Sequence, residues 1–174
     1  MIRPGDMRGI MIGVVHAVGR DDNAGSVKLR FPWLEASYVS DWVSFAQDGA
    51  GPDRGVFFMP EENDEVVVAF LNGEISRPFV IGATYNPRNP APSADPRQRM
   101  LRSKNGHTIR FVDSTESGGD RGALIIEDGH GNRITMSNGY MKIEATGVLE
   151  LSAPQIVLSG PGWTRPVVQY SQPV

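Results

Sequence analysis

The sequence predicts an all-β protein in two parts, a small N-terminal barrel and a C-terminal region of short, repetitive strands. The 174 residues include 20 glycines and 13 prolines, and this composition favours many short strands and turns over helices. Apolar and polar residues alternate with a period of two in several short runs, which is the pattern of half-buried strands. No window of the sequence shows a convincing helical period.

The N-terminal half contains six runs that we expect to form strands. Proline or glycine ends several of them, as at Pro32, Pro60 and Asn72-Gly73. Six strands in about 75 residues predict a small closed or partly closed antiparallel barrel, and a barrel of the oligonucleotide/oligosaccharide-binding (OB) type fits that length. The expected strands cover residues 10–18, 26–31, 41–46, 56–59, 66–71 and 78–84.

A proline-rich stretch, YNPRNPAPSADPRQ, follows the barrel and is typical of a stiff connector. Residues 160–174 hold three prolines and two glycines, so we expect a cap or tail there rather than a covering layer. The chain is therefore divided into a barrel domain at 1–85, a connector at 86–101, a spike domain at 102–159 and a C-terminal tip segment at 160–174.

The spike domain reads as short one-sided strands, at 108–112, at 123–127 and then between turns such as Asn138-Gly139 and Thr146-Gly147. A five-residue strand buries two or three apolar side chains, worth roughly 5 kcal/mol, against about 1 to 2 kcal/mol of backbone entropy per residue. Single strands of this kind are unstable, so we expect copies of the segment to cover one another. The expected core positions are Ile134, Met136, Met141, Ile143, Leu149, Leu151, Ile156 and Leu158.

This reasoning predicts an intertwined β-helix or β-prism, formed by several copies of the chain, after the barrel. A monomeric sandwich or solenoid remains an alternative. The chain has a net charge of −3 and a pI near 5.6, which does not suggest a surface for nucleic acid or anionic membranes. The absence of cysteine excludes disulfides and thiolate metal sites. The sequence has no signal-peptide core and no membrane-length apolar run, so synthesis in the cytoplasm is expected.

Motifs in both parts resemble a known family. In the barrel these are VKLRFPWL at 27–34, SDWV at 40–43, GAGPDRG at 49–55 and RPFVIG at 77–82. In the spike domain they are SKNGH at 103–107, DGHGNRI at 128–134 and IEATGVLEL at 143–151. Their order is similar to that of the VgrG and phage baseplate assembly protein V family, an OB-fold followed by a β-helix.

The resemblance implies a structural role without enzymatic activity or cofactor. Proteins of this family form the trimeric central spike of contractile injection machines: phage tails, tailocins, type VI-like systems or extracellular injectors. The implied partners are a baseplate hub carried by a separate chain, the inner tube and baseplate components, a PAAR-type tip protein and the target cell envelope, with no nucleic acid. The protein would be assembled into the baseplate of a phage-tail-like particle.

Two further clusters are predicted from their position. Asp41, Trp42, Asp53 and Arg54 form the family-like cluster of the barrel, which we interpret as structural and facing the hub. Trp163, Val167, Val168 and Tyr170 are apolar groups that an exposed end would not ordinarily need, so they are predicted to contact the tip protein.

Metal binding, glycoside hydrolysis and nucleic-acid binding are less well supported by the sequence than the structural role. His130 would recur three times around a trimer axis, but a solvated turn residue explains it more simply, and no metal or catalytic residue is expected. The acids of EENDE at 61–65 could serve glycoside hydrolysis, although an exposed turn fits better. Nucleic-acid binding through Trp33, Trp42 and Phe57-Phe58 is the main alternative function, and a peptidoglycan-degrading enzyme ranks below it.

Overall fold

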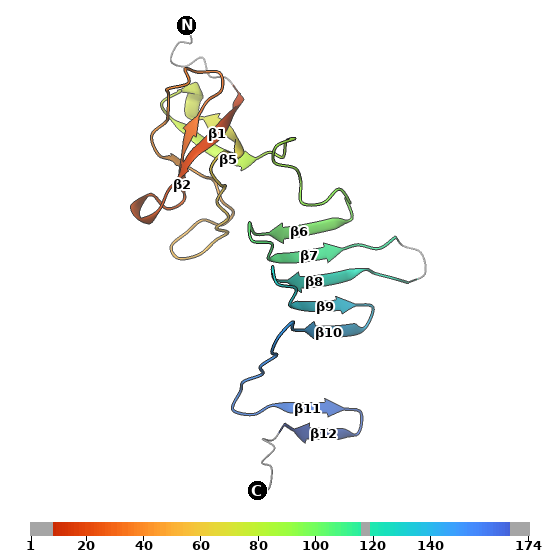
Figure 1. Ribbon diagram of the computed structural model, residues 1–174. Coiled ribbons are helices and arrows are strands. Elements are labelled where there is room, and N and C mark those ends of the chain that lie inside the picture. The colour runs from red at the N-terminus through yellow and green to blue at the C-terminus, as the bar shows by residue number, and fades with distance from the viewer. Residues whose placement is uncertain (1–8, 116–118, 168–174) are drawn as a thin grey trace. The chain divides into compact units, whose positions relative to one another are not determined.

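The computed structural model describes residues 9–115 and 119–167 and divides the chain into two compact units, Met1–Ala91 and Pro92–Val174 (Figure 1). The regular elements of the described residues are strands and two short 3-10 helices, Asp21–Asn23 (η1) and Leu71–Gly73 (η2). The predicted all-β class is therefore confirmed. None of the helices among the described residues is long and apolar enough to span a membrane.

The first unit is one five-stranded sheet in the order β3-β2-β1-β4-β5. All neighbouring strands in it are antiparallel. Phe45, just after β3, forms a parallel bridge with Val80 of β5, and the Ala46 amide donates to the Val80 carbonyl at 2.8 Å. The two edge strands thus meet, and the sheet becomes a nearly closed barrel consistent with an OB fold. Its strands are Ile10–Val18 (β1), Ser26–Arg30 (β2), Val43–Ser44 (β3), Glu65–Phe70 (β4) and Pro78–Ala83 (β5).

Alternation along these strands builds the barrel core. In β4 the burial changes at every residue, with Val66, Val68 and Phe70 inside. Register shifts interrupt the β1–β2 and β4–β5 ladders, and such bulges raise the local twist that a small barrel needs. The buried apolar side chains are Val15, Val27, Leu29, Phe31, Val43, Val66, Val68, Phe70 and Val80.

Two of the six expected barrel strands differ from the structure. The run at 41–46 is reduced to β3, two residues long. The run at 56–59 is not a strand, and the side chains of Phe57 and Phe58 are 70% and 53% exposed. Gly55 at φ +127 and Pro60 bracket that run. Its backbone hydrogen bond within the described chain joins the Val56 amide to the Asp48 carbonyl. An apolar run without an adjacent strand edge cannot become a strand.

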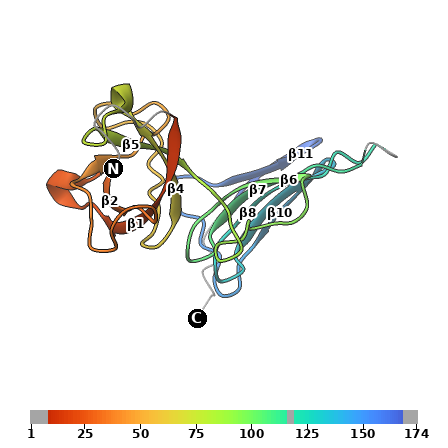
Figure 2. The same ribbon diagram turned by 90° about the horizontal axis from the view of Figure 1, so that it is seen from above.

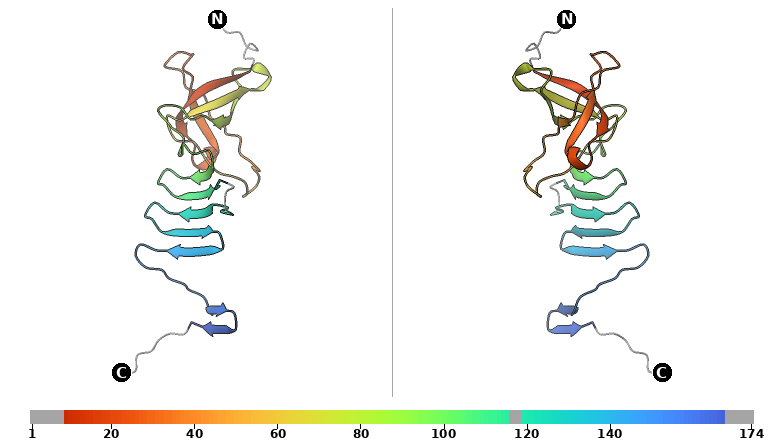
Figure 3. Two further views of the ribbon diagram at one scale, coloured as in Figure 1. Left: turned by 90° about the vertical axis from the view of Figure 1, so that its right-hand side faces the viewer. Right: turned by 90° about the vertical axis from the view of Figure 1, so that its left-hand side faces the viewer.

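The second unit contains a five-stranded antiparallel meander, in which each strand pairs with the next one along the chain. The strands lie one above another (Figure 1) and form a single layer when seen from the sides (Figure 3). They are Gln98–Arg102 (β6), Thr108–Val112 (β7), Ala123–Glu127 (β8), Arg133–Ser137 (β9) and Tyr140–Glu144 (β10). The predicted strands at 108–112 and 123–127 are confirmed.

This sheet has no core of its own among the described residues. Every fully buried apolar side chain of the described chain belongs to the first unit, and the sheet contributes only Thr108, at 9% exposure, to the buried class. The meander also shows that β7, β8 and β9 have both edges occupied by strands of the same chain. Strand exchange between copies, expected from the intertwined prediction, is thus not available to those three strands.

The end of the unit differs from the sequence prediction at Leu149 and Leu151. These expected core positions have the alternation of a strand but no regular structure, because no strand edge of the described chain lies beside them. In the segment expected to be a cap or tail, Trp163–Pro166 (β12) pairs with Val157–Gly160 (β11) as a hairpin. Pro161 and Gly162 form its turn, with Gly162 at φ +77, which is the combination that a tight turn requires.

Candidate assembly interface

The two faces of the β6–β10 sheet are chemically different. Residues that lie directly opposite each other in an antiparallel ladder point to the same face. The register therefore defines one column that runs from Leu101 to Ile143 and a second, parallel column from Arg99 to Met141, both on one side of the sheet. The first column comprises Leu101, Ile109, Ile126, Ile134 and Ile143, and the second comprises Arg99, Phe111, Leu124, Met136 and Met141.

Nine of these ten positions are apolar, and we call the nine the apolar face. They are not covered: Leu101 is 63%, Phe111 51% and Met141 60% exposed, and Ile109, Ile126 and Ile143 also belong to the exposed class. Leu124, Ile134 and Met136 in the middle are half-buried by their neighbours. A continuous apolar surface of this kind is uncommon on a monomer and indicates an interaction surface.

The opposite side carries the charges, and we call it the charged face. Glu127 lies between two arginines: its carboxylate oxygens are 3.6 Å from an Nη2 of Arg110 and 3.6 Å from that of Arg133. On β10, the Lys142 ammonium and the Glu144 carboxylate are 2.5 Å apart. This ion pair lowers the pKa of Glu144 and raises that of Lys142. The side chains of these ion pairs keep between 26% and 47% of their surface exposed. Ion pairs that water reaches contribute little stability each, so the charged face is suited to solvent.

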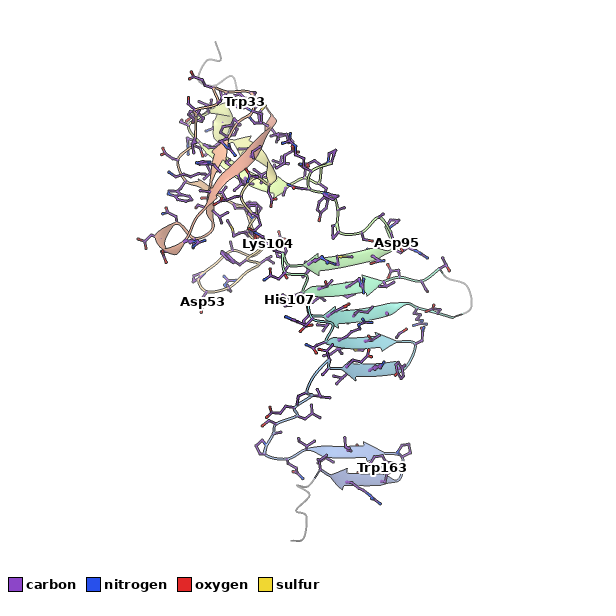
Figure 4. All side chains as sticks on the ribbon, viewed as in Figure 1. Trp33, Asp53, Asp95, Lys104, His107 and Trp163 are labelled. Carbon is purple, nitrogen blue, oxygen red and sulfur yellow. The ribbon has the colours of Figure 1, made fainter. Side chains whose placement is uncertain are left out.

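The turns at one end of the sheet are held by side-chain hydrogen bonds. The Asp128 carboxylate accepts the backbone amides of His130 at 2.8 Å and Asn132 at 2.9 Å, and the Asn132 side-chain amide at 2.6 Å. These bonds, that to the Asn132 side chain first, lower the pKa of Asp128. The Gly129 amide donates to Nδ1 of His107 at 3.3 Å, which ties this turn to the β6–β7 turn where Figure 4 shows His107 beside Lys104.

The structure brings half of the predicted core residues together. Ile134, Met136, Met141 and Ile143 share the apolar face across β9 and β10. The other four are not assembled with them: Leu149 and Leu151 lie in the segment without strands, 52% and 61% exposed, whereas Ile156 and Leu158 lie at the β11–β12 hairpin. Their role in a trimer core stays a prediction.

Sequence reasoning missed five members of the apolar face, all on β6, β7 and β8. Ile109 and Phe111 alternate with Arg110, just as Ile134 and Met136 alternate with Thr135. The same two-residue period was therefore visible in the sequence earlier in the chain. The missed residues are Leu101, Ile109, Phe111, Leu124 and Ile126.

The predicted hub cluster comes from two segments of the barrel, residues 41–42 before β3 and the turn at 51–54. The Trp42 ring has the Lys28 ammonium 5.2 Å from its centroid, a cation–π arrangement over β2. Asp53 and Arg54 belong to a tight turn, in which Gly51 and Arg54 exchange backbone hydrogen bonds of 3.1 and 3.3 Å; Figure 4 shows Asp53 at the end of that loop. Within the described residues, no hydrogen bond or ion pair joins Asp41 or Trp42 to this turn.

The predicted tip contacts are only partly described. Trp163 and Val167 are 51% and 53% exposed, while Val168 and Tyr170 lie outside the described residues. Trp163 faces Gly160 across the hairpin, and a Cβ on Gly160 would come within 2.5 Å of the indole nitrogen. The absence of a side chain at Gly160 thus lets the indole lie against the opposite strand, and Figure 4 shows Trp163 on β12.

Several side chains considered for other chemistry have structural partners. The Asp64 carboxylate accepts the Glu61 amide at 2.8 Å and the Asn89 side-chain amide at 3.2 Å, and the Glu65 carboxylate accepts the Thr84 hydroxyl at 2.7 Å. Trp33, labelled in Figure 4, packs on Phe31 with 5.2 Å between the ring centroids. No group of three or more His, Cys, Asp or Glu side chains suited to a metal ion occurs between residues 9 and 167, apart from the undescribed 116–118.

Known proteins share the barrel of this chain. Residues 11–85 match the family described as the type VI secretion system/phage-baseplate injector OB domain. The Vibrio cholerae serotype O1 protein named type VI secretion system spike protein VgrG3 is 42% identical over 79 residues, which cover 43% of this chain and 8% of that protein.

Two other relatives extend the comparison. The Pseudomonas aeruginosa spike protein VgrG5 is 30% identical over 114 residues, covering 63% of this chain and 14% of its own. The Vibrio cholerae serotype O1 protein named actin cross-linking toxin VgrG1 is 35% identical over 82 residues, covering 45% of this chain and 8% of its own. The matches therefore span a small fraction of these relatives, between 8% and 14% of their length.

Proposed function

Through its OB domain the chain belongs to the type VI secretion system/phage-baseplate injector family, the VgrG and baseplate assembly protein V family, and on that premise we propose that it is the trimeric central spike of a contractile injection machine. The observation that carries the proposal is the exposed apolar face of the β6–β10 sheet. A spike needs rigid, elongated copies that are stable only together. A sheet with one apolar face and no core meets that need.

The driving force for association is the burial of this face. Complete burial of an aliphatic or aromatic side chain is worth about 1.5–3 kcal/mol. Nine side chains that are already partly covered therefore offer on the order of 10 kcal/mol per copy. Three sheets arranged as a triangular prism would place the three apolar faces inside and the charged faces outside. Two sheets stacked as a sandwich would also cover them, and the family resemblance favours three.

The prism proposed here differs from the intertwined one predicted from sequence. Because each meander is completed by strands of its own chain, each side of the prism over residues 98–144 would come from one copy. Intertwining would be limited to the segments after β10, where Leu149 and Leu151 remain exposed. This arrangement keeps the predicted spike domain and changes only how the chains share it.

The ends of the protein would meet the other components of the machine. The exposed Trp42 and the Asp53-Arg54 turn are proposed to face a hub carried by another chain. Trp163 and Val167 on the β11–β12 hairpin are proposed to contact a PAAR-type tip protein. The assembled spike would then link the hub to the tip at the inner tube's leading end and enter the target envelope, without an enzymatic step of its own.

Sedimentation velocity of the purified chain tests the central claim. We expect a single species with the mass of three 19.0 kDa chains that persists down to micromolar concentrations. A stable monomer or a dimer across that range would contradict the trimer. Retention on single-stranded DNA at low salt would instead favour the OB-fold's other common role, and release of peptidoglycan fragments would favour an enzyme.

The tip contact has its own test. A PAAR protein encoded near this chain should co-migrate with the trimer in size-exclusion chromatography, and Trp163→Ala should weaken that binding because it removes the largest exposed apolar group of the hairpin. Thr164→Ala, on the same strand, is the matched control and should bind normally. Equal binding by both variants would show that Trp163 is not part of the contact with the tip protein.

A further inference from the structure

One charged residue interrupts the otherwise apolar columns of the β6–β10 sheet. Arg99 occupies the β6 position of the column that continues with Phe111, Leu124, Met136 and Met141. Its guanidinium forms an ion pair with the Asp113 carboxylate at the end of β7. Asp113 also donates its backbone amide to the Arg97 carbonyl at 3.0 Å, so both partners belong to the same end of the sheet.

The first column of the apolar face gives few distinctions between one level and the next, whereas the second changes from Phe111 and Leu124 to Met136 and Met141. The first column reads Leu, Ile, Ile, Ile, Ile from β6 to β10. If copies pack through their apolar faces, a displacement of one copy by one strand, about 4.8 Å, would replace isoleucine by isoleucine over most of this column. Hydrophobic contact along the first column therefore discriminates poorly between the aligned and the displaced assembly.

The Arg99–Asp113 pair removes this degeneracy. In the aligned assembly, the Arg99–Asp113 ion pairs of all copies lie together at the β6 end of the apolar face. Each arginine is then near carboxylates, and each carboxylate is near arginines. A displacement by one strand in either direction would move one copy's Arg99 against the Phe111 level of its neighbour. Asp113 belongs to the same chain and moves with Arg99, so the displacement would press an ion pair against apolar side chains. The cost of taking both charges from water can exceed their mutual attraction, and a polar position in an apolar interface can specify register at a cost in stability.

We propose that the Arg99–Asp113 ion pair sets the axial alignment of the copies, as a specificity determinant whose partner is a second copy of this chain. This inference rests on the proposed trimer and names what aligns it. The apolar face supplies the driving force for association, and the ion pair selects one of several nearly equivalent stackings.

Disulfide trapping tests the inference, because the sequence has no native cysteine that could form competing disulfides. Ile126→Cys reports alignment through 126–126 disulfides. A mixture of Ile126→Cys and Ile134→Cys chains, unfolded and refolded together, reports a displacement of one strand through 126–134 disulfides, because these residues are opposite each other on β8 and β9. With the native ion pair, we expect the 126–126 product to dominate and the 126–134 product to be minor.

The ion pair is then replaced by apolar residues of similar size, Arg99→Met with Asp113→Leu. We expect the assembly to persist, with the 126–126 product falling to a minority and the 126–134 product rising. Lys142→Met with Glu144→Leu removes an ion pair from the charged face and is the matched control, so its disulfide pattern should stay native. The reversed pair, Arg99→Asp with Asp113→Arg, should restore the native pattern.

The outcomes separate this inference from the proposed function. A monomer in the parent chain overturns the trimer and the alignment device together. A trimer whose disulfide pattern is unchanged by the apolar replacement overturns the alignment device alone. Loss of assembly in the apolar variant, or a scrambled pattern in the reversed pair, also overturns it, because the apolar face should still associate and the restored pair should still align.

Discussion

A single carboxylate, that of Asp128, organises the turn between β8 and β9. It accepts two backbone amides and one side-chain amide, donors that the five-residue turn would otherwise leave to water. Asn132, the side-chain donor, uses its own carbonyl to accept the Thr146 amide at 2.9 Å. One acidic residue thus connects the β8–β9 turn to the chain that leaves β10.

This arrangement predicts a dependence of stability on pH. The pKa of Asp128 lies below its ordinary value of 3.8, so the unfolded chain binds the proton more tightly than the folded one. The stabilisation is present above pH 3.8 and is lost as pH falls through the lower, folded value. We expect carboxyl NMR to find Asp128 titrating below 3.8, and Asp128→Ala to reduce the loss of stability on acidification. A titration at or above 3.8 would contradict the hydrogen-bond assignment.

At the scale of elements, the alternation of side chains decides which substitutions matter. Met136 and Thr135 are neighbours on β9, but Met136 belongs to the apolar face, while Thr135 lies opposite Lys142 on the charged side. Neighbouring positions of a strand point to opposite faces. The same substitution should therefore have opposite consequences at the two positions.

We expect Met136→Asp to abolish assembly, because each copy would bring an unpaired carboxylate into the apolar interior at a cost of several kcal/mol. Thr135→Asp should leave the oligomer intact, since the new carboxylate faces Lys142. Sedimentation and thermal melting of the two variants measure this. A Met136→Asp oligomer as heat-resistant as the parent chain would show that the apolar face is not the interface.

The elements also show where sequence reasoning succeeds. Alternation identified β7 and β8 with their bounds because each has neighbouring strands on both sides. It failed at Phe57-Phe58 and at Leu149–Leu151, which have the apolar content of strands but no adjacent edge in the described chain. Propensity is local, whereas a strand needs a partner, so the partner's absence could not be predicted from these residues. The family, by contrast, was predicted correctly from motifs such as GAGPDRG at 49–55.

At the scale of the whole molecule, the two units obtain their stability differently. The barrel buries nine apolar side chains within one chain, whereas the β6–β10 sheet leaves its apolar face open. A unit with its own core unfolds independently of protein concentration. A unit stabilised by association becomes more stable as concentration rises.

Thermal unfolding of the full chain should therefore show two transitions. In a Trp163→Phe variant the remaining tryptophans, Trp33 and Trp42, report the barrel, and we expect their transition to be independent of concentration. In a Trp33→Phe, Trp42→Phe variant, Trp163 reports the second unit, and its midpoint should rise with concentration. A midpoint for Trp163 that is insensitive to a hundredfold dilution would indicate a self-sufficient fold.

The meander of β6 to β10 also has a mechanical consequence. Figure 2 looks down the direction in which the strands are stacked. The inter-strand hydrogen bonds run along that same direction. Compression along this direction shortens the hydrogen bonds and is resisted by every strand pair. Tension along it can separate the strands one at a time, beginning at a free edge of the sheet. Such a stack would resist compression better than extension, an asymmetry that would suit the proposed spike.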